Sequence, residues 1–275
     1  MLWLLLACTN TPETPDSGGE TDTELPEDTQ IYKPDGAFCS PETRIGHIAV
    51  QRYGGSNATF YAQIYDTPSP WIGSPAQESE DCAHYSYESV LCEGCEAGQQ
   101  CSVDGACVDA PRTLKDLELS VSADGQSTSH SADAQGLIWG QLALESTFSF
   151  ALSGAVEVQS EEMVLPEPIT PVVTSNGDYD KPGTLKVSWQ GSTEGWVQTV
   201  IPINHHANSP TFTACHSPAD QSEFEVPAAM VDPLAVSTGL EFQGLEQGQF
   251  AAVETPAGCV QISVVNQVYS NVQFE

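Results

Sequence analysis

Residues 185–189 read L-K-V-S-W, and this short stretch shows the pattern that decides the fold of the chain. The apolar Leu185, Val187 and Trp189 alternate with the polar Lys186 and Ser188. Successive side chains of a β-strand point to opposite faces of a sheet. The alternation therefore predicts a strand with one buried face and one solvated face.

The same alternation recurs before and after this segment. It predicts strands in L-E-L-S-V-S (117–122), F-S-F-A-L (148–152), W-V-Q-T-V-I (196–201), F-E-V (224–226), C-V-Q-I-S-V-V (259–265) and N-V-Q-F-E (271–275). Turn-forming pairs such as Asn176-Gly177, Pro182-Gly183 and Gly191-Ser192 separate the strands. Only P-A-A-M-V-D-P-L (227–234) predicts a helical turn, since proline is accepted at a first helical position. We therefore expect an antiparallel β-sandwich over residues 111–275.

The segment before it, residues 37–91, has a shorter and more mixed pattern. R-I-G-H-I-A-V-Q-R-Y (44–53) and A-T-F-Y-A-Q-I-Y (58–65) are predicted to be two strands, joined as a hairpin at residues 54–57. A segment this short makes only a marginal core, so we expect a small β subdomain that needs a disulfide. The predicted fold class is all-β: an antiparallel β-sandwich preceded by a small disulfide-rich β subdomain.

The chain has nine cysteines, and assigning Cys8 to a lipid anchor leaves an even number. Four of the others cluster in C-E-G-C-E-A-G-Q-Q-C-S-V-D-G-A-C (92–107), where Asp104-Gly105 predicts a tight turn between the last two cysteines. We interpret residues 92–110 as a disulfide knot that acts as a hinge or spacer. The predicted pairs are Cys92–Cys101, Cys95–Cys107, Cys39–Cys82 and Cys215–Cys259.

The same cluster has two other possible roles, a zinc site and a redox centre. A zinc site usually joins two closely spaced ligand pairs across a longer insert, whereas only Cys92 and Cys95 are closely spaced here. A thioredoxin-like redox centre at the same pair would need a βαβ setting, and no helix is predicted nearby. Disulfides at this density belong in an oxidising compartment outside the cytoplasm.

The start of the chain, L-W-L-L-L-A followed by Cys8, resembles the lipobox of bacterial lipoproteins. In that family an apolar segment ends in Leu-x-Ala/Gly-Cys, a match here to Leu5, Leu6, Ala7 and Cys8, and the cysteine is acylated. Residues 1–8 are thus interpreted as a partial signal peptide that lacks a basic region; the alternative is a fortuitous apolar end. Residues 9–36 are acidic and rich in Pro and Thr, which predicts a disordered tether. Thr9 favours the outer membrane or cell surface.

Charge narrows the classes of partner. Seven Lys and Arg stand against 38 Asp and Glu, for a formal net charge of −31, so we expect no nucleic-acid partner. Two explanations of this excess of acidic residues are open: it keeps an exported protein soluble, or it gathers divalent cations near the cell surface. The sequence has no run of about 18 apolar residues, so no transmembrane helix is predicted.

From the knot onward the chain is similar to predicted surface lipoproteins of myxobacteria and related deltaproteobacteria. The similarity covers roughly residues 80–275. It rests on the knot, on G-L-I-W-G-Q-L (136–142), on the final G-C-V-Q-I-S-V-V (258–265) and on a stretch carried by Cys215, Asp220, Phe224, Val226, Pro227, Ala228 and Ala229. The resemblance implies a cell-surface location and a β-rich fold, and it assigns no catalytic residues.

Three groups of residues are candidates for binding a metal ion or a sugar. His205, His206 and His216 lack metal-ligand spacing and are expected in loops or at the surface. Asn176, Asp178 and Asp180 offer oxygen ligands to calcium, although a hairpin tip explains them equally. A sugar-stacking surface could come from the aromatic residues, although core packing is their commoner role: Tyr53, Tyr61, Tyr65, Trp71, Trp139, Trp189 and Trp196.

No nucleophile elbow, P-loop or dinucleotide fingerprint is present, so we assign no catalytic residue, no cofactor and no metal. Asn57-Ala58-Thr59 matches a glycosylation sequon that a bacterial lipoprotein would leave unmodified. We expect a non-enzymatic, lipid-anchored envelope or cell-surface protein whose β-sandwich serves binding or structure, with the membrane as one partner and an unidentified protein or glycan as another. The alternatives are a calcium- or carbohydrate-binding adhesin, and a hydrolase that uses carboxylates in a cleft between the two β parts.

Overall fold

The computed structural model describes residues 36–54, 57–86, 92, 94–143, 147–175, 183–202, 211–232 and 240–273. The expected leader with Cys8 and the expected tether lie outside this part of the chain, apart from Gly36. Nearly all regular structure in these residues is β-strand, which confirms the predicted all-β fold. None of the helical segments described has the length and apolar character needed to cross a bilayer.

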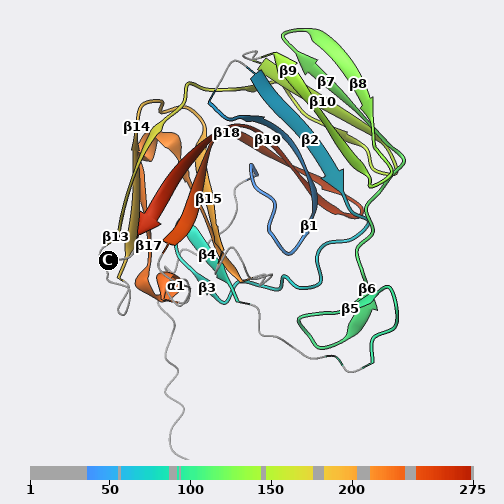
Figure 1. Ribbon diagram of the computed structural model, residues 1–275, viewed down its shortest axis with the longest axis horizontal. Helices are drawn as coiled ribbons and strands as arrows, with labels where there is room; N and C mark the ends of the chain where they lie inside the picture. Colours follow the sequence, from blue (N-terminus) through green and yellow to red (C-terminus); the bar gives the residue numbers. More distant parts are fainter. Residues whose placement is uncertain are drawn as a thin grey trace, which may run out of the picture. The chain divides into compact units, whose positions relative to one another are not determined.

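The largest sheet combines strands from the beginning and the end of the chain (Figure 1). β1 pairs with β2 on one side and with β19 on the other; the β1–β19 pair is parallel and the other recorded pairs are antiparallel. Its order is β3 (Gln77–Glu78), β4 (Cys82–Tyr85), β16 (Phe212–Pro218), β15 (Trp196–Pro202), β18 (Leu240–Thr255), β19 (Gly258–Gln273), β1 (Arg44–Arg52), β2 (Asn57–Ile64) and β9 (Leu137–Ala143).

The prediction of a separate β subdomain at residues 37–91 is wrong. β1 and β2 form the predicted hairpin, but β1 also adds to β19, and β4 adds to β16. The physical reason is that an isolated two-stranded hairpin leaves unpaired main-chain groups along both edges and is barely stable in water. Residues 31–275 accordingly group as one unit, and the expected boundary before the sandwich does not divide the strands.

One half of the large sheet packs against a second sheet. Ile48, Phe60 and Ile262 point from the large sheet toward Leu119 and Phe148, and all five side chains are almost completely buried. The alternation predicted for residues 117–122 and 148–152 supplies the opposing face. This second sheet contains β11 (Val158–Gln159), β10 (Thr147–Gly154), β7 (Leu117–Ala123) and β8 (Gln126–Ser131), with β12 (Met163–Val164) paired to β10.

The other half of the large sheet packs against a third sheet. As the alternation predicts, Leu185, Val187 and Trp189 are buried, and they meet Val197 and Leu245 of the large sheet. The third sheet is β13 (Thr170–Ser175), β14 (Leu185–Gln190) and β17 (Glu223–Val226), and the predicted helical turn follows it as α1 (Ala228–Val231).

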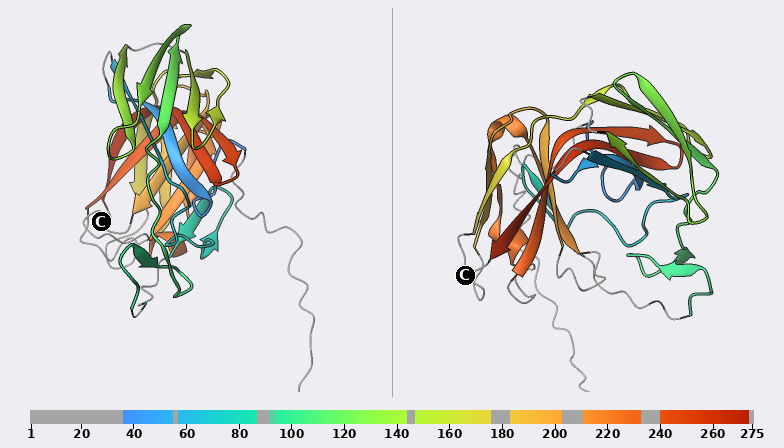
Figure 2. Two further views of the ribbon diagram at one scale, coloured as in Figure 1. Left: turned by 90° about the vertical axis from the view of Figure 1, so that its right-hand side faces the viewer. Right: turned by 45° about the horizontal axis from the view of Figure 1, so that its top comes forward.

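A single long hairpin, β18–β19, belongs to both halves (Figure 2). Both strands are 16 residues long. Val260 and Ile262 of β19 lie in the first core, whereas Leu245 of β18 lies in the second, with Val268 packed against it. The two cores are therefore joined by continuous main-chain pairing.

The two long-range disulfides differ from the predicted ones. Cys39 is bonded to Cys259, and Cys82 is bonded to Cys215. The predicted pairs Cys39–Cys82 and Cys215–Cys259 are wrong because Cys82 and Cys215 face each other across β4 and β16, while Cys259 lies at the start of β19 beside β1. Both bonds connect the first part of the chain to the last.

The predicted knot is present with its expected pairs, Cys92–Cys101 and Cys95–Cys107. Its two short strands, β5 (Gln99–Cys101) and β6 (Cys107–Asp109), are antiparallel. The turn between them includes Gly105, which has a φ of 75° that glycine adopts without strain.

Candidate functional site

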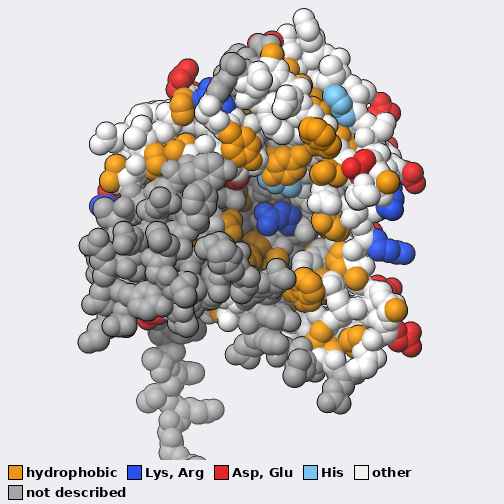
Figure 3. Space-filling view, viewed as in Figure 1, with side chains coloured by type: hydrophobic (Ala, Val, Ile, Leu, Met, Phe, Trp, Pro, Cys, Tyr) orange, Lys and Arg blue, Asp and Glu red, His pale blue; other side chains and the backbone are white. Residues whose placement is uncertain are grey.

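An open pocket of about 540 Å³ lies on the polar face of β1 and β2. The space-filling view shows a hollow with basic side chains inside it and hydrophobic side chains around it (Figure 3). The turn before β1, the loop after β2 and β5 of the knot all contribute to it. The pocket is therefore assembled from three separate parts of the chain.

Arg44 and His47 both line this pocket because β1 contains a bulge. Residues three apart in a regular strand would point to opposite faces. The register with β19 shifts between Arg44 and Gly46, so that Arg44 pairs with Cys259 and His47 pairs with Gln261. Since Cys259 and Gln261 share one face of β19, the bulge turns both basic side chains to the same side.

His47 is held as a neutral ring. Its hydrogen bonds join Nε2 to Ser263 Oγ (2.8 Å) and Nδ1 to the Tyr61 hydroxyl (3.3 Å). Burial, together with the nearby positive charge of Arg44, lowers the pKa of His47 to about 3. Ser263 is completely buried, so this serine–histidine pair has no access to a substrate.

Beyond Tyr61 the hydrogen bonds continue to Glu246 on β18. Gln51 donates to both the Tyr61 hydroxyl and Glu246 Oε1, each at 3.3 Å, and Gln267 donates to Glu246 Oε1 at 2.8 Å. Burial raises the pKa of Tyr61 to about 12 and also raises the pKa of Glu246. Glu246 lines a different cavity, of about 190 Å³, in which it is the one acidic residue of the described lining. The described lining of this cavity therefore does not supply the pair of carboxylates that the hydrolase alternative requires.

The loop after β2 brings aromatic side chains to the pocket. Tyr61 lies within β2 and Tyr65 just beyond its end, and Trp71 lies in the following turn with 41% of its surface exposed. The main-chain N–H of Trp71 donates to Ser69 Oγ at 3.4 Å. Thr67 and Ser69 also line the pocket. The loop thus presents rings and hydroxyl groups side by side.

The disulfide knot also contributes to the pocket. Gln100 of β5 lines it, and the main-chain N–H of Val103 donates to the carbonyl oxygen of Pro70 at 3.0 Å. Just after the knot, Arg112 makes an ion pair of 3.0 Å with Asp66. The main-chain N–H of Arg112 bonds to the carboxyl of Asp66 and, with the guanidinium, holds its pKa below the usual value. These contacts attach the loop carrying Trp71 to the knot.

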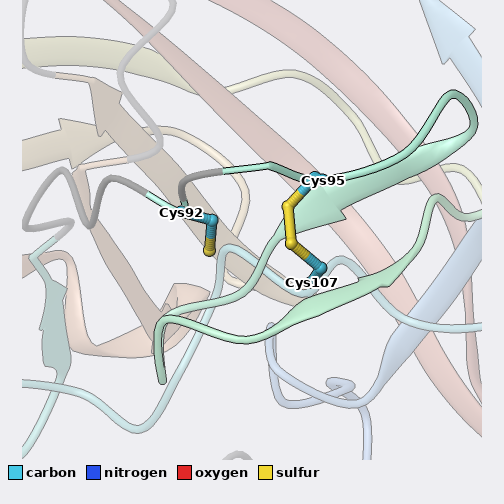
Figure 4. Close-up of side chains that lie close together, drawn as sticks. All are labelled: Cys92, Cys95 and Cys107. Carbon is cyan, nitrogen blue, oxygen red and sulfur yellow. A yellow bond between two sulfur atoms is a disulfide. The ribbon is translucent and has the colours of Figure 1, made fainter.

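The knot also bears on the zinc interpretation. The sulfur atoms of Cys92, Cys95 and Cys107 lie within 4.8 Å of one another, close enough to share an ion. The close-up shows Cys95 bonded to Cys107 with the sulfur of Cys92 beside them (Figure 4), and Cys92 is bonded to Cys101. A thiolate is the form of cysteine that binds metal, so the bonded sulfurs are not zinc ligands.

The histidine and calcium-ligand candidates do not contribute to the described lining of the pocket. His205, His206 and the proposed calcium ligands Asn176, Asp178 and Asp180 lie outside the described residues. His216 was expected in a loop or at the surface, but it is buried in β16 against Phe38, with ring centroids 4.2 Å apart.

The seven aromatic residues that could form a sugar-stacking surface lie in three different environments. Tyr61, Tyr65 and Trp71 share the pocket, whereas Trp189 lies in the second core and Trp196 packs edge-on against Phe38. Tyr53 and Trp139 are exposed outside it. Arg44, His47 and Gln100 were not predicted to be functional residues, although all three line the pocket. Residues 44–53 were predicted to form a strand, but the bulge that groups Arg44 with His47 has no local signal.

A scan against known protein families and a search of curated proteins find no match to this chain.

Proposed function

We propose that this chain is a non-enzymatic, lipid-anchored protein of the outer membrane or cell surface, and that it binds a carbohydrate in the pocket lined by Arg44, Tyr65 and Trp71. The observation that carries the proposal is the pocket itself, in which partly exposed rings lie among hydrogen-bonding side chains. Sugars present C–H faces that pack on aromatic rings and hydroxyl groups that need donors and acceptors. Gln63, Thr67, Ser69 and Gln100 offer both.

Export is supported by the oxidised cysteines. All eight cysteines after Cys8 are paired, and disulfides at this density persist outside the cytoplasm. The lipobox-like residues before Cys8 support attachment to a membrane. The acidic segment that follows them would then separate the folded unit from the lipid.

Binding is tested on a glycan array, followed by calorimetric titration of each glycan retained. We expect Trp71→Ala to weaken binding by about tenfold or more, the scale of one lost ring contact. The matched control is Trp139→Ala, because Trp139 is 62% exposed on β9 and is outside the described lining of the pocket. Retention of no glycan, or equal loss in both variants, would contradict the proposal.

Anchoring and oxidation are tested together by intact-mass analysis of the protein from membranes. The expected species begins at Cys8, carries acyl mass and lacks eight hydrogens relative to the reduced chain, two for each of the four disulfides. A cytoplasmic form with free thiols and no acyl mass would refute the proposed location.

A further inference from the structure

Another cavity, of about 470 Å³, lies at an open edge of β18, and we call it the edge cavity. Residues 249–255 of β18 pair with β19 on one side, and no strand of the described residues pairs with them on the other. β15 does not extend this far, because its first residue, Trp196, already pairs with Gly248. This edge of β18 therefore has room for one more extended segment.

The segment that runs from β11 to β12 also lines the edge cavity, and its position is fixed. The main-chain N–H of Ser160 donates to the carbonyl oxygen of Phe150, and Ser160 Oγ accepts from the main-chain N–H of Phe150, both at 2.9 Å. The main-chain N–H of Val164 donates to Gln249 Oε1 at 2.6 Å, which attaches the end of this segment to β18. The cavity thus lies between elements that are bonded to each other.

The lining of the edge cavity combines apolar and acidic side chains. Met163 and Phe250 are buried, and Trp196 is half-buried. Glu161 and Glu162 are exposed, and neither belongs to an ion pair recorded among the described residues. The described lining contains no basic residue. A matching occupant would therefore present an apolar or aromatic side chain next to a positive charge.

The chain itself passes this edge at Gly36, the first described residue. The carbonyl oxygen of Gly36 accepts from the main-chain N–H of Ala252 at 3.3 Å, and the residues on either side of Ala252 both line the edge cavity. Two residues later, Phe38 packs on Phe250 and on Trp196, with ring centroids 4.8 and 5.3 Å apart. The contacts of Gly36 and Phe38 thus bring the start of the described chain to the cavity.

The residues just before Gly36 carry the chemistry that this cavity would accept. Residues 31–35 read I-Y-K-P-D, so that Tyr32 directly precedes Lys33. Lys33 is the one basic residue in the first 43, whereas residues 9–30 contain seven acidic ones. Three residues of extended chain span at most about 10 Å, so Lys33 stays close to the edge at which Gly36 is bonded.

We propose that residues 31–35 occupy the edge cavity as an additional extended segment along β18. The Tyr32 ring lies on the aromatic side chains of the cavity, and the Lys33 ammonium lies beside Glu161 and Glu162. An exposed ion pair contributes little stability by itself, so the ring contact and main-chain hydrogen bonds to β18 supply the attraction and the charges set the register.

This inference goes beyond the proposed function, because it concerns how the folded unit is joined to the preceding chain. The segment is attached to Gly36, so its local concentration at the cavity is on the order of millimolar, which favours it over a peptide of another molecule. Docking covers a strand edge that could otherwise pair with another chain. It also leaves residues 9–30 as the free length of the tether.

Carbodiimide crosslinking of the intact, disulfide-bonded protein tests the contact directly. The reagent joins an amine to a touching carboxylate with loss of water, so peptide mass spectrometry should find Lys33 linked to Glu161 or Glu162. The double variant Glu161→Gln/Glu162→Gln should lose this crosslink. Glu157→Gln is the matched control, because Glu157 is exposed nearby in the sequence and is outside the described lining. It should keep the crosslink.

Amide hydrogen exchange tests whether the segment covers the edge. Lys33→Glu places a third negative charge beside two others, so exchange in residues 249–255 should become about threefold faster or more. Exchange in β7 should stay unchanged, which shows that the variant is folded. The matched control is Lys115→Glu, since Lys115 is exposed and outside the described lining of the cavity. It should leave exchange in residues 249–255 as in the parent protein.

Three results would overturn the proposal. The first is a Lys33 crosslink that persists in Glu161→Gln/Glu162→Gln, and the second is unchanged exchange of residues 249–255 in Lys33→Glu. The third comes from a mixture of isotope-labelled and unlabelled protein: crosslinks found only between the two forms would assign the edge cavity to a second copy of the chain. None of these results bears on carbohydrate binding, which is measured at the other pocket.

Discussion

Cys39 is bonded to Cys259 although 220 residues separate them in the sequence. The main-chain N–H of Cys39 also donates to Gln261 Oε1 at 2.8 Å, so the segment before β1 is attached to β19 at two points. Next to this bond, Phe38 packs on Phe250 with ring centroids 4.8 Å apart. The turn that leads into Arg44 is therefore held in place by the last strand of the chain.

The long-range disulfides should contribute more to stability than those of the knot. The chain-entropy model assigns about 5 kcal/mol to a loop of the length closed by Cys82–Cys215 and about 2.5 kcal/mol to the nine-residue separation of Cys92–Cys101. We expect the double variant Cys82→Ala/Cys215→Ala to lose more free energy of unfolding than Cys92→Ala/Cys101→Ala. Urea titration of both proteins under oxidising conditions measures the difference. Equal losses would contradict the entropic account.

Gly140 is required by a close approach between strands. It pairs with Phe60, and a Cβ atom placed on it would lie 2.4 Å from the Phe60 ring. Because Phe60 is completely buried in the first core, Gly140→Ala should cost about 1–3 kcal/mol of unfolding free energy. The control is Gly244→Ala on β18, where a Cβ atom would meet nothing within 4 Å. Thermal or urea unfolding in which both variants match the parent protein would show that the Phe60 ring can shift freely.

Asn266 of β19 holds two buried groups through its side-chain amide. Its Nδ2 donates to the carbonyl oxygen of Pro166 and to Gln247 Oε1, both at 2.8 Å, and the side chain is buried. Asn266→Ala leaves two buried acceptors without this donor, so we expect a loss of about 1–3 kcal/mol in the free energy of unfolding. Asn57→Ala, at an exposed position at the start of β2, should change it by less than about 0.5 kcal/mol. A loss at Asn57 as large as that at Asn266 would be inconsistent with this assignment.

His47 should make stability depend on pH in the mildly acidic range. In the unfolded chain its pKa returns to 6.5, whereas in the folded protein it is about 3. Protons therefore bind preferentially to the unfolded state between these values, and stability decreases as pH falls through this window. From pH 7 to about pH 5 the contribution reaches at most about 2 kcal/mol.

Comparison with His47→Gln isolates this contribution from that of the carboxyl groups. The variant should lose less stability than the parent protein over the same pH interval, measured by urea unfolding at each pH. A parallel loss in the two proteins would mean that His47 takes up its proton in the folded state near the ordinary pKa.

Local patterns predicted the strands well, for a reason visible in particular residues. Leu185, Val187 and Trp189 alternate within five residues, and alternation specifies which face is buried whatever the strand pairs with. The pairs Cys92–Cys101 and Cys95–Cys107 were also accessible, because their separations of 9 and 12 residues and the Asp104-Gly105 turn leave little choice.

The pocket residues were less accessible. Tyr61, Tyr65 and Trp71 stood out as aromatic residues, but Trp189 and Trp196 carried the same signal and are packed inside. Exposure depends on which sheet covers a strand, and that information is distributed over the whole chain. Arg44 and Gln100 come together only through the bulge in β1 and the attachment of the knot to the loop before Trp71.

The sequence by itself determined that this chain is built from β-strands with alternating faces and that a local pair of disulfides closes residues 92–107. The tertiary structure alone decided that Cys39 bonds Cys259, that Cys82 bonds Cys215 and that β1 lies parallel to β19. The physical reason is that the entropy of closing a loop changes only slowly with its length, so spacing hardly distinguishes one distant partner from another. The choice is made by which strand edges and which apolar faces fit together.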